Sequence, residues 1–202
     1  LLFYFGMVTI DGDYKGVTKF IIPNEEVRDQ MHTYLLDTYK ENDLTYDSFN
    51  KGKLESQLAY DGNYKAYFEF IADSLKRYSS QRDKQKGEAF VHGFTLAMTS
   101  QNQFYRPISE LDNDGGYADI FLSPLCDIYK DMVDSYIIEL KYCKTNTADE
   151  QLQVLFKEAS AQICRYANSD IVKESVKTTK LHKLVVIYRG AEMVMCEEVT
   201  EE

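Results

Sequence analysis

The sequence has no long hydrophobic run and no paired cysteine motif, and each absence excludes a class of protein. No apolar stretch approaches the roughly 18 residues of a membrane-spanning helix, so we expect no membrane association. The four cysteines form neither a CxxC pair nor a Cys/His cluster at zinc spacing. We therefore expect reduced thiols and a cytoplasmic location, although the spacing leaves pairing in space open.

Acidic residues outnumber basic ones, with 33 Asp and Glu against 23 Lys and Arg. The formal net charge is -10, which counts against broad attraction to nucleic acid, because such attraction depends on Lys and Arg neutralising phosphates. Two short basic stretches remain, near residues 76–86 and 173–183, and each is either a phosphate-contacting segment or a solvated surface. The chain begins on Leu1 without the basic start and cleavage site of a signal peptide, so we expect a fragment of a longer protein.

The order of the expected elements indicates a mixed α/β fold. A small hairpin followed by helices is expected over residues 1–80, and the polar stretch Gln81 to Gly87 is the best candidate boundary. Beyond it, the patterns predict a helix, three strands, a helix and a strand, near residues 87–98, 103–109, 117–123, 135–142, 148–168 and 183–189. A further strand near 192–199 is an option.

A carboxylate and an ammonium stand two residues apart in the most strand-like run, residues 136–142. Because side chains alternate across a strand, Glu139 and Lys141 share one face, roughly 7 Å apart along the backbone. Asp119 lies in a second strand-like run upstream. A buried, unpaired carboxylate is costly and either takes up a proton or recruits a cation. The pattern indicates metal chemistry, and its plain alternative is a solvent-facing strand with an ordinary acid and base.

Four motifs in order resemble the PD-(D/E)XK nuclease superfamily, and more closely its branch in which the domain follows an AAA-ATPase-like domain. They are Glu88 in Gly-Glu-Ala-Phe-Val-His-Gly-Phe, Asp119 in Gly-Tyr-Ala-Asp-Ile, the triplet Glu139-Leu-Lys141, and Gln162 in Ala-Ser-Ala-Gln-Ile-Cys-Arg-Tyr. The family's literal Pro-Asp is absent, because Ala118 precedes Asp119. The resemblance covers roughly residues 86–190 and implies a restriction-endonuclease-like αβββαβ core, with a central mixed sheet flanked by helices.

The resemblance also implies a domain division. Residues 1–80 resemble the end of an ATPase-like region with a helical linker, and residues 81–202 resemble the nuclease-like domain. The implied partners are nucleic acid, DNA in first place, and an N-terminal ATPase-like domain of the same protein. No P-loop motif occurs, so these residues are not expected to hydrolyse ATP.

Five residues carry the implied chemistry at the metal. Asp119 and Glu139 would hold Mg²⁺ or Mn²⁺ together with the carbonyl of Leu140, because hard cations prefer oxygen ligands. Glu88 would approach the metal shell from its helix, unless it is only a first-turn acid favoured by the helix dipole. Lys141 would orient the attacking water and stabilise negative charge.

A second group, on the helix near residues 148–168, would face the substrate. By the resemblance, Gln162 hydrogen-bonds the water, the lysine or a phosphate, although a solvent-facing glutamine fits its neighbours equally well. Arg165 and Tyr166 lie within one turn of it and are candidate substrate contacts, of which only Tyr166 matches the family pattern. His92, one turn after Glu88, is either a ligand or an ordinary hydrogen-bonded histidine.

The predicted function is therefore a divalent-metal-dependent nuclease that hydrolyses phosphodiester bonds of nucleic acid. Two alternatives stay open. One is a noncatalytic interaction or regulatory module that keeps the nuclease-like fold, and the other is a metal-dependent hydrolase of a different phosphate ester. No GxSxG motif supports a serine hydrolase.

Overall fold

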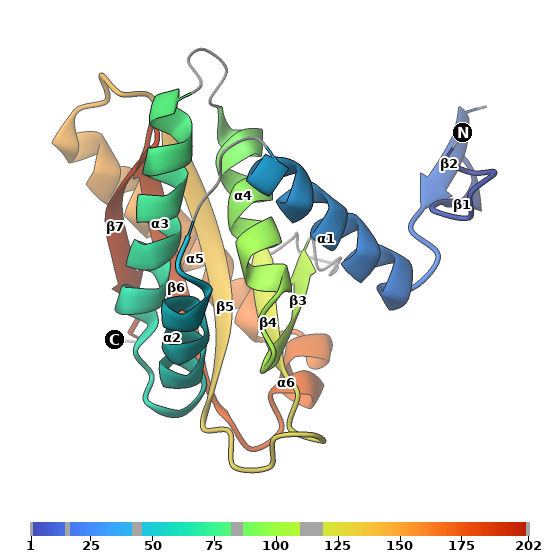
Figure 1. The fold of residues 1–202 in the computed structure, drawn as a ribbon. Helices are drawn as coiled ribbons and strands as arrows, with labels where there is room; N and C mark the ends of the chain where they lie inside the picture. The colour runs from blue at the N-terminus through green and yellow to red at the C-terminus, as the bar shows by residue number, and fades with distance from the viewer. Residues whose placement is uncertain (1, 15–16, 42–45, 82–86, 110–118, 201–202) are drawn as a thin grey trace.

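The computed structural model describes residues 2–14, 17–41, 46–81, 87–109 and 119–200 (Figure 1). Its N-terminal part holds β1 (Thr9–Tyr14), β2 (Val17–Ile21), α1 (Glu25–Glu41), α2 (Ser48–Tyr60) and α3 (Tyr64–Gln81). The rest holds α4 (Glu88–Ser100), β3 (Tyr105–Ser109), β4 (Ile120–Pro124), β5 (Asp134–Cys143), α5 (Asp149–Ala167), α6 (Asp170–Val176), β6 (Lys180–Arg189) and β7 (Glu192–Glu198).

The central sheet has five strands in the order β3-β4-β5-β6-β7. Only the β5–β6 pair is parallel, and the other three pairs are antiparallel. The parallel pair needs a long crossover, which α5 and α6 supply. The predicted αβββαβ order, the central mixed sheet with flanking helices and the small N-terminal hairpin are thereby confirmed. The short helix α6 was not predicted.

Helices cover both faces of the sheet (Figure 1). α2, α3 and α4 pack on one face and α5 and α6 on the other. The buried face of β5 toward α2–α4 presents Tyr136, Ile138 and Leu140, while Ile137 and Cys143 belong to clusters on the α5 side. Alternation along β5 therefore assigns each side chain to one of two apolar layers, as the sequence pattern predicted.

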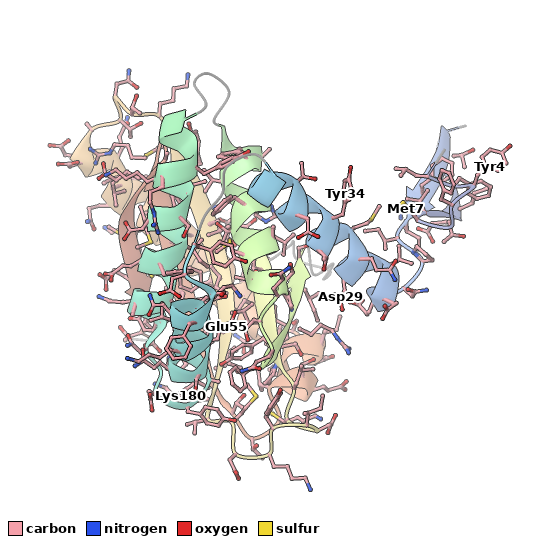
Figure 2. All side chains as sticks on the ribbon, viewed as in Figure 1. Tyr4, Met7, Asp29, Tyr34, Glu55 and Lys180 are labelled. Carbon is pink, nitrogen blue, oxygen red and sulfur yellow. The ribbon has the colours of Figure 1, made fainter. Side chains whose placement is uncertain are left out.

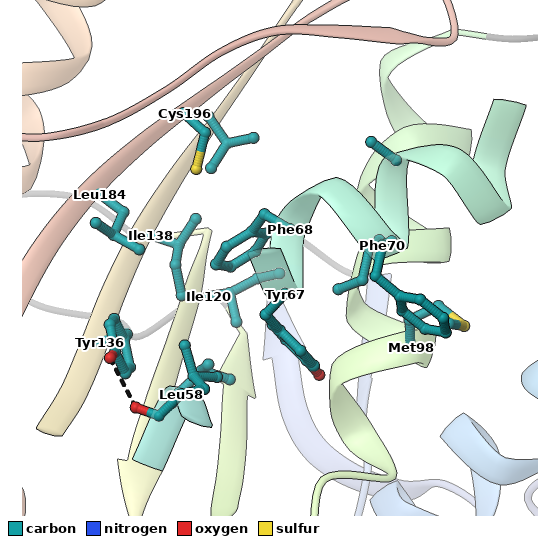
Figure 3. Close-up of a cluster of buried hydrophobic side chains, with 14 of the residues drawn as sticks. Leu58, Tyr67, Phe68, Phe70, Met98, Ile120, Tyr136, Ile138, Leu184 and Cys196 are labelled. Carbon is teal, nitrogen blue, oxygen red and sulfur yellow. Dashed lines mark hydrogen bonds between the residues drawn. The ribbon is translucent and has the colours of Figure 1, made fainter. Parts of the chain in front are cut away.

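The larger apolar layer joins residues from the two halves of the chain (Figure 3). Leu58 and Tyr67, from α2 and α3, are fully buried against Ile138 of β5. The Tyr136 hydroxyl donates a hydrogen bond of 2.8 Å to the Leu58 carbonyl. Helices α2 and α3 thus share one hydrophobic core with the sheet, and the domain division at residue 80 stays a prediction.

The N-terminal hairpin lies apart from the sheet, beyond α1, which packs against α4 (Figures 1 and 2). Figure 2 shows Tyr4 and Met7 at this outlying end, where the Tyr4 side chain is 90% exposed. Within the described residues, no helix combines the length and the apolar character that crossing a bilayer requires.

A buried histidine bridges the first residue of β5 and the last residue of β7. His182 Nε2 lies 2.8 Å from Asp134 Oδ1 and its Nδ1 lies 2.9 Å from Glu198 Oε1. Its ring stacks on Tyr136, with centroids 5.0 Å apart. Carboxylates only accept hydrogen bonds, so the ring donates to both when it carries two protons. This contact joins three strands at the end of the sheet opposite to Lys141.

We expect His182→Leu to lower the free energy of unfolding by about 3 kcal/mol, because it leaves the buried Asp134 carboxylate without the hydrogen bond from the imidazole ring. Urea denaturation measures this loss. Glu198→Gln is the matched control and should cost less than about 1 kcal/mol, since the Glu198 side chain is 28% exposed and water can hydrate its neighbours. The double variant His182→Leu/Asp134→Asn should regain part of the stability, and equal losses in the single and double variants would contradict the assignment.

Candidate metal centre

The two strand acids come together where β4 and β5 part. The antiparallel register pairs Phe121 with Ile137 and Ile120 with Ile138, and Ile120 is the first residue of β4. Asp119 directly precedes that residue, so continuing the register by one step sets it opposite Glu139. The predicted neighbourhood of the two carboxylates therefore follows from strand pairing.

Glu139 and Lys141 share the face of β5 that is turned toward α5, between Ile137 and Cys143. Glu139 is 3% exposed, and its Oε1 accepts a hydrogen bond of 2.7 Å from Lys141 Nζ. The lysine side chain is 22% exposed, so its ammonium stands between the buried acid and solvent. Lys141 is thus the nearest source of positive charge to a carboxylate that has lost most of its water.

Asp119 is tied to β5 by its side chain. Its Oδ2 accepts a hydrogen bond of 2.7 Å from the main-chain N–H of Leu140. Burial raises the pKa of Asp119, and the charge of Glu88 adds to this, while the Leu140 N–H, His92 and Lys141 act in the opposite direction. The carboxylate therefore sits in a desolvated place with only partial compensation.

Glu139 is the more costly of the two acids. Burial, and after it the negative charge of Asp119, raises the pKa of Glu139 to about 7, against the lowering influence of Lys141. Its second oxygen, Oε2, is buried and has no hydrogen-bond partner among the described residues. A buried acceptor without a donor costs free energy, which either a proton on Glu139 or a bound cation would relieve.

A pocket of about 440 Å³ opens beside this pair of acids. Its walls come from the first turns of α4, from Asp119 and from the end of β5, namely Glu88, Ala89, Val91, His92, Asp119, Leu140, Lys141 and Tyr142. Glu139 does not line the pocket and lies buried next to it. The structure thus brings together four of the predicted residues in the pocket and a fifth, Glu139, against its wall.

The predicted residues of α5 are placed elsewhere. Gln162 is half-buried on the helix that covers the Glu139 face of the sheet, but it does not line the pocket. Tyr166 is 5% exposed and packs in the apolar cluster with Phe121 and Ile163. Arg165 is exposed. The assigned roles of these three residues stay predictions, and the geometry around the pocket does not add to them.

His92 and Tyr142 also line the pocket, although the sequence assigned no firm role to either. His92 Nε2 lies 3.3 Å from the main-chain oxygen of Asp119. The signal for His92 is its spacing of four residues from Glu88, which places both on one face of α4. Tyr142 gave no such signal, because alternation sets it on the opposite face of β5 from Lys141.

The residues present fit a hard divalent cation. Asp119 and Glu139 offer carboxylate oxygens, the Leu140 carbonyl lies between Glu139 and Lys141 in the chain, and Oε2 of Glu139 is an orphaned buried acceptor. Within the described ranges, no three His, Cys, Asp or Glu side chains form a ready-made cluster. Such a cation would thus be held by two carboxylates, with main-chain oxygen, water or Glu88 completing its shell.

Comparison with known proteins gives one match. The family model described as the PD-(D/E)XK nuclease superfamily matches residues 86–198. This segment holds α4, the whole five-stranded sheet and every predicted site residue. No curated protein and no solved structure matches the chain.

We expect Glu139→Gln to stabilise the metal-free protein at pH 8 and to have little effect on its stability near pH 4.5. An acid whose folded-state pKa is raised destabilises the fold as it ionises, so the penalty grows from pH 4.5 to about 7 and is constant above. A shift of that size corresponds to about 3 kcal/mol. Urea denaturation in EDTA at both pH values measures the difference.

Glu158→Gln, on the exposed side of α5, is the matched control for this experiment and should leave the pH dependence unchanged. If Glu139→Gln and wild type lose stability in parallel between pH 4.5 and 8, Glu139 is not a buried acid whose pKa is raised in the folded protein.

Proposed function

Because the chain belongs to the PD-(D/E)XK nuclease superfamily, we propose that it is a divalent-metal-dependent nuclease that hydrolyses phosphodiester bonds of nucleic acid, with DNA as the first substrate to test. One observation carries the proposal. Two desolvated carboxylates, Asp119 and Glu139, stand side by side next to Lys141, at the wall of a pocket open to solvent.

Charge explains why such a site needs a metal ion. Glu88, Asp119 and Glu139 set three carboxyl groups against the single ammonium of Lys141, and this balance repels an anionic phosphodiester. A divalent cation, when bound, supplies the compensating charge and polarises a nonbridging phosphoryl oxygen. Asp119 and Glu139 would hold it, with the Leu140 carbonyl and Glu88 as further oxygen donors.

Lys141 would have a different role from the two acids, because it would act on the water molecule and the phosphate and not on the metal ion. Its ammonium is partly exposed at the pocket and 2.7 Å from Glu139 Oε1, so it is held in place by the same acid that would hold the metal. From there it can orient a water molecule toward the phosphorus and stabilise the negative charge that develops. Gln162 would assist from α5 and Tyr166 would contact the substrate, as the family resemblance implies, while Arg165 is a candidate contact only by its place within one turn of Gln162.

We also infer that residues 1–80 are the end of an ATPase-like region and its linker. This inference rests on the family resemblance, and the packing of α2 and α3 on the sheet would set the end of that region directly against the nuclease-like domain.

Lys141→Ala should lower the rate of DNA cleavage in Mg²⁺ or Mn²⁺ by at least about 100-fold, because removing one group that stabilises developing charge typically costs that much. Gel assays on single- and double-stranded DNA and on RNA measure the rate. Lys130→Ala, in the exposed loop before β5 and so at its other end, should cleave like wild type. Equal rates for Lys141→Ala and wild type would refute the role of this lysine.

Asp119→Asn should weaken Mn²⁺ binding by more than about tenfold, which is the least that losing even an outer-shell partner of a metal usually costs. Asparagine keeps an oxygen that can accept from the Leu140 N–H, so the fold should be preserved. Isothermal titration calorimetry measures the affinity, with Asp131→Asn on the exposed loop as control. A wild-type protein that binds neither Mn²⁺ nor Mg²⁺ would point to a noncatalytic module instead.

A further inference from the structure

Asp119 lies outside the hydrogen-bonded ladder of the sheet. The β3–β4 register ends with Ser109 opposite Ile120, and the β4–β5 register ends with Ile120 opposite Ile138. Among the residues that the structure describes, neither neighbouring strand therefore pairs with the main chain of Asp119. Its position at the edge of the pocket has to be fixed by other contacts if its carboxylate is to keep a defined place.

Two contacts from opposite sides meet this need. The Leu140 N–H of β5 holds the side chain at Oδ2, at 2.7 Å. His92 of α4 holds the main-chain oxygen through Nε2, at 3.3 Å. Together they fix both ends of one residue, the carboxylate against the strand and the carbonyl against the helix.

His92 is well anchored for such a role. Its neighbours on α4, Val91 and Phe94, are buried in the main apolar core, so the helix is fixed relative to the sheet. A carbonyl oxygen only accepts hydrogen bonds, so Nε2 carries the proton in this contact. A protonated ring nitrogen has no lone pair for a metal ion, which makes Nε2 a support for Asp119 and not a ligand.

We propose that His92 is a positioning residue that fixes the carboxylate of Asp119 in the metal centre by holding its main-chain carbonyl. The positioning of Asp119 by His92 follows from the contact geometry, and its effect on metal binding rests on the proposed function. Turning the peptide at Asp119 would swing the carboxylate away from Glu139, and a metal centre tolerates displacements of only about 0.5 Å. Loss of the His92 contact therefore weakens metal binding without removing a ligand.

His92→Leu and His92→Gln test the proposal as a pair. Leucine removes the donor, whereas glutamine keeps an amide N–H near the position of Nε2. Calorimetry with Mn²⁺ should give an affinity at least about tenfold weaker for His92→Leu, the range known for outer-shell partners, and a largely restored affinity for His92→Gln. Wild-type affinity in His92→Leu would overturn the proposal, and so would equal losses in the two variants.

A second readout needs no metal. The Leu140 amide is held by Asp119 Oδ2, so its hydrogen exchange reports whether the carboxylate keeps its place. Nuclear magnetic resonance in EDTA should show this amide exchanging about tenfold faster in His92→Leu and near the wild-type rate in His92→Gln. The buried β6 amides of Val185 and Val186 should be unchanged in both variants and serve as controls.

The two readouts separate failure of the inference from failure of the proposed function. If wild type binds no Mn²⁺, the metal-dependent function is wrong, and Leu140 exchange alone then decides whether His92 positions Asp119. If wild type binds Mn²⁺ while both Leu140 exchange and affinity are unaffected by His92→Leu, the function stands and the positioning role is wrong.

Discussion

Removal of water from two neighbouring carboxylates is the constraint on which the centre of this protein depends. Asp119 and Glu139 are each buried, and the charge of the first adds to the cost of ionising the second. A fold optimised only for stability would replace one of them by an apolar residue. Two such costly acids beside a solvent-open pocket are typical of a functional site, and this is the basis of the proposed metal binding.

The surrounding fold offsets the free-energy cost of burying these two carboxylates. β5 lies in the middle of the sheet and is covered on both faces, so Ile137, Ile138 and Leu140 are anchored in two apolar layers around Glu139. Rigid packing of these neighbours keeps the acid from turning outward to recover its water. At the other end of β5, His182 links this strand to β7 through Asp134 and Glu198, so the stabilising contact and the costly acids lie at opposite ends of the strand.

Much of this arrangement could be predicted from local sequence. Alternation along residues 136–142 correctly separated Glu139 and Lys141 from their apolar neighbours, because period-two patterning fixes the faces of any strand. The order of helices and strands followed from the same periodicities. The strand acids could be placed on neighbouring strands in advance because they lay in consecutive strand-like runs and because the family resemblance gave their order.

Contacts between segments that are distant in the sequence could not be predicted from local patterns. His182 meets an aspartate 48 residues away, and nothing near either residue signals the contact. The packing of α2 and α3 into the same core as the sheet likewise depends on which apolar faces meet in three dimensions. The helix α6 is only seven residues long, too short for a clear helical period. Tyr166 matches the family motif, yet its side chain is buried. Helical periodicity cannot tell whether such a residue belongs to the hydrophobic core or to a functional site.

The ion pair between Lys141 and Glu139 links the two halves of the proposed chemistry. The ammonium stands 2.7 Å from Glu139 Oε1 and is the main offset to a buried negative charge. An ammonium engaged in this way is less available to a phosphate or a water molecule. Under the proposed function, a cation bound to Glu139 at Oε2 would weaken the pull of this acid on Lys141 while leaving the ammonium beside it. Metal binding and the action of the lysine on the substrate would then be coupled through Glu139.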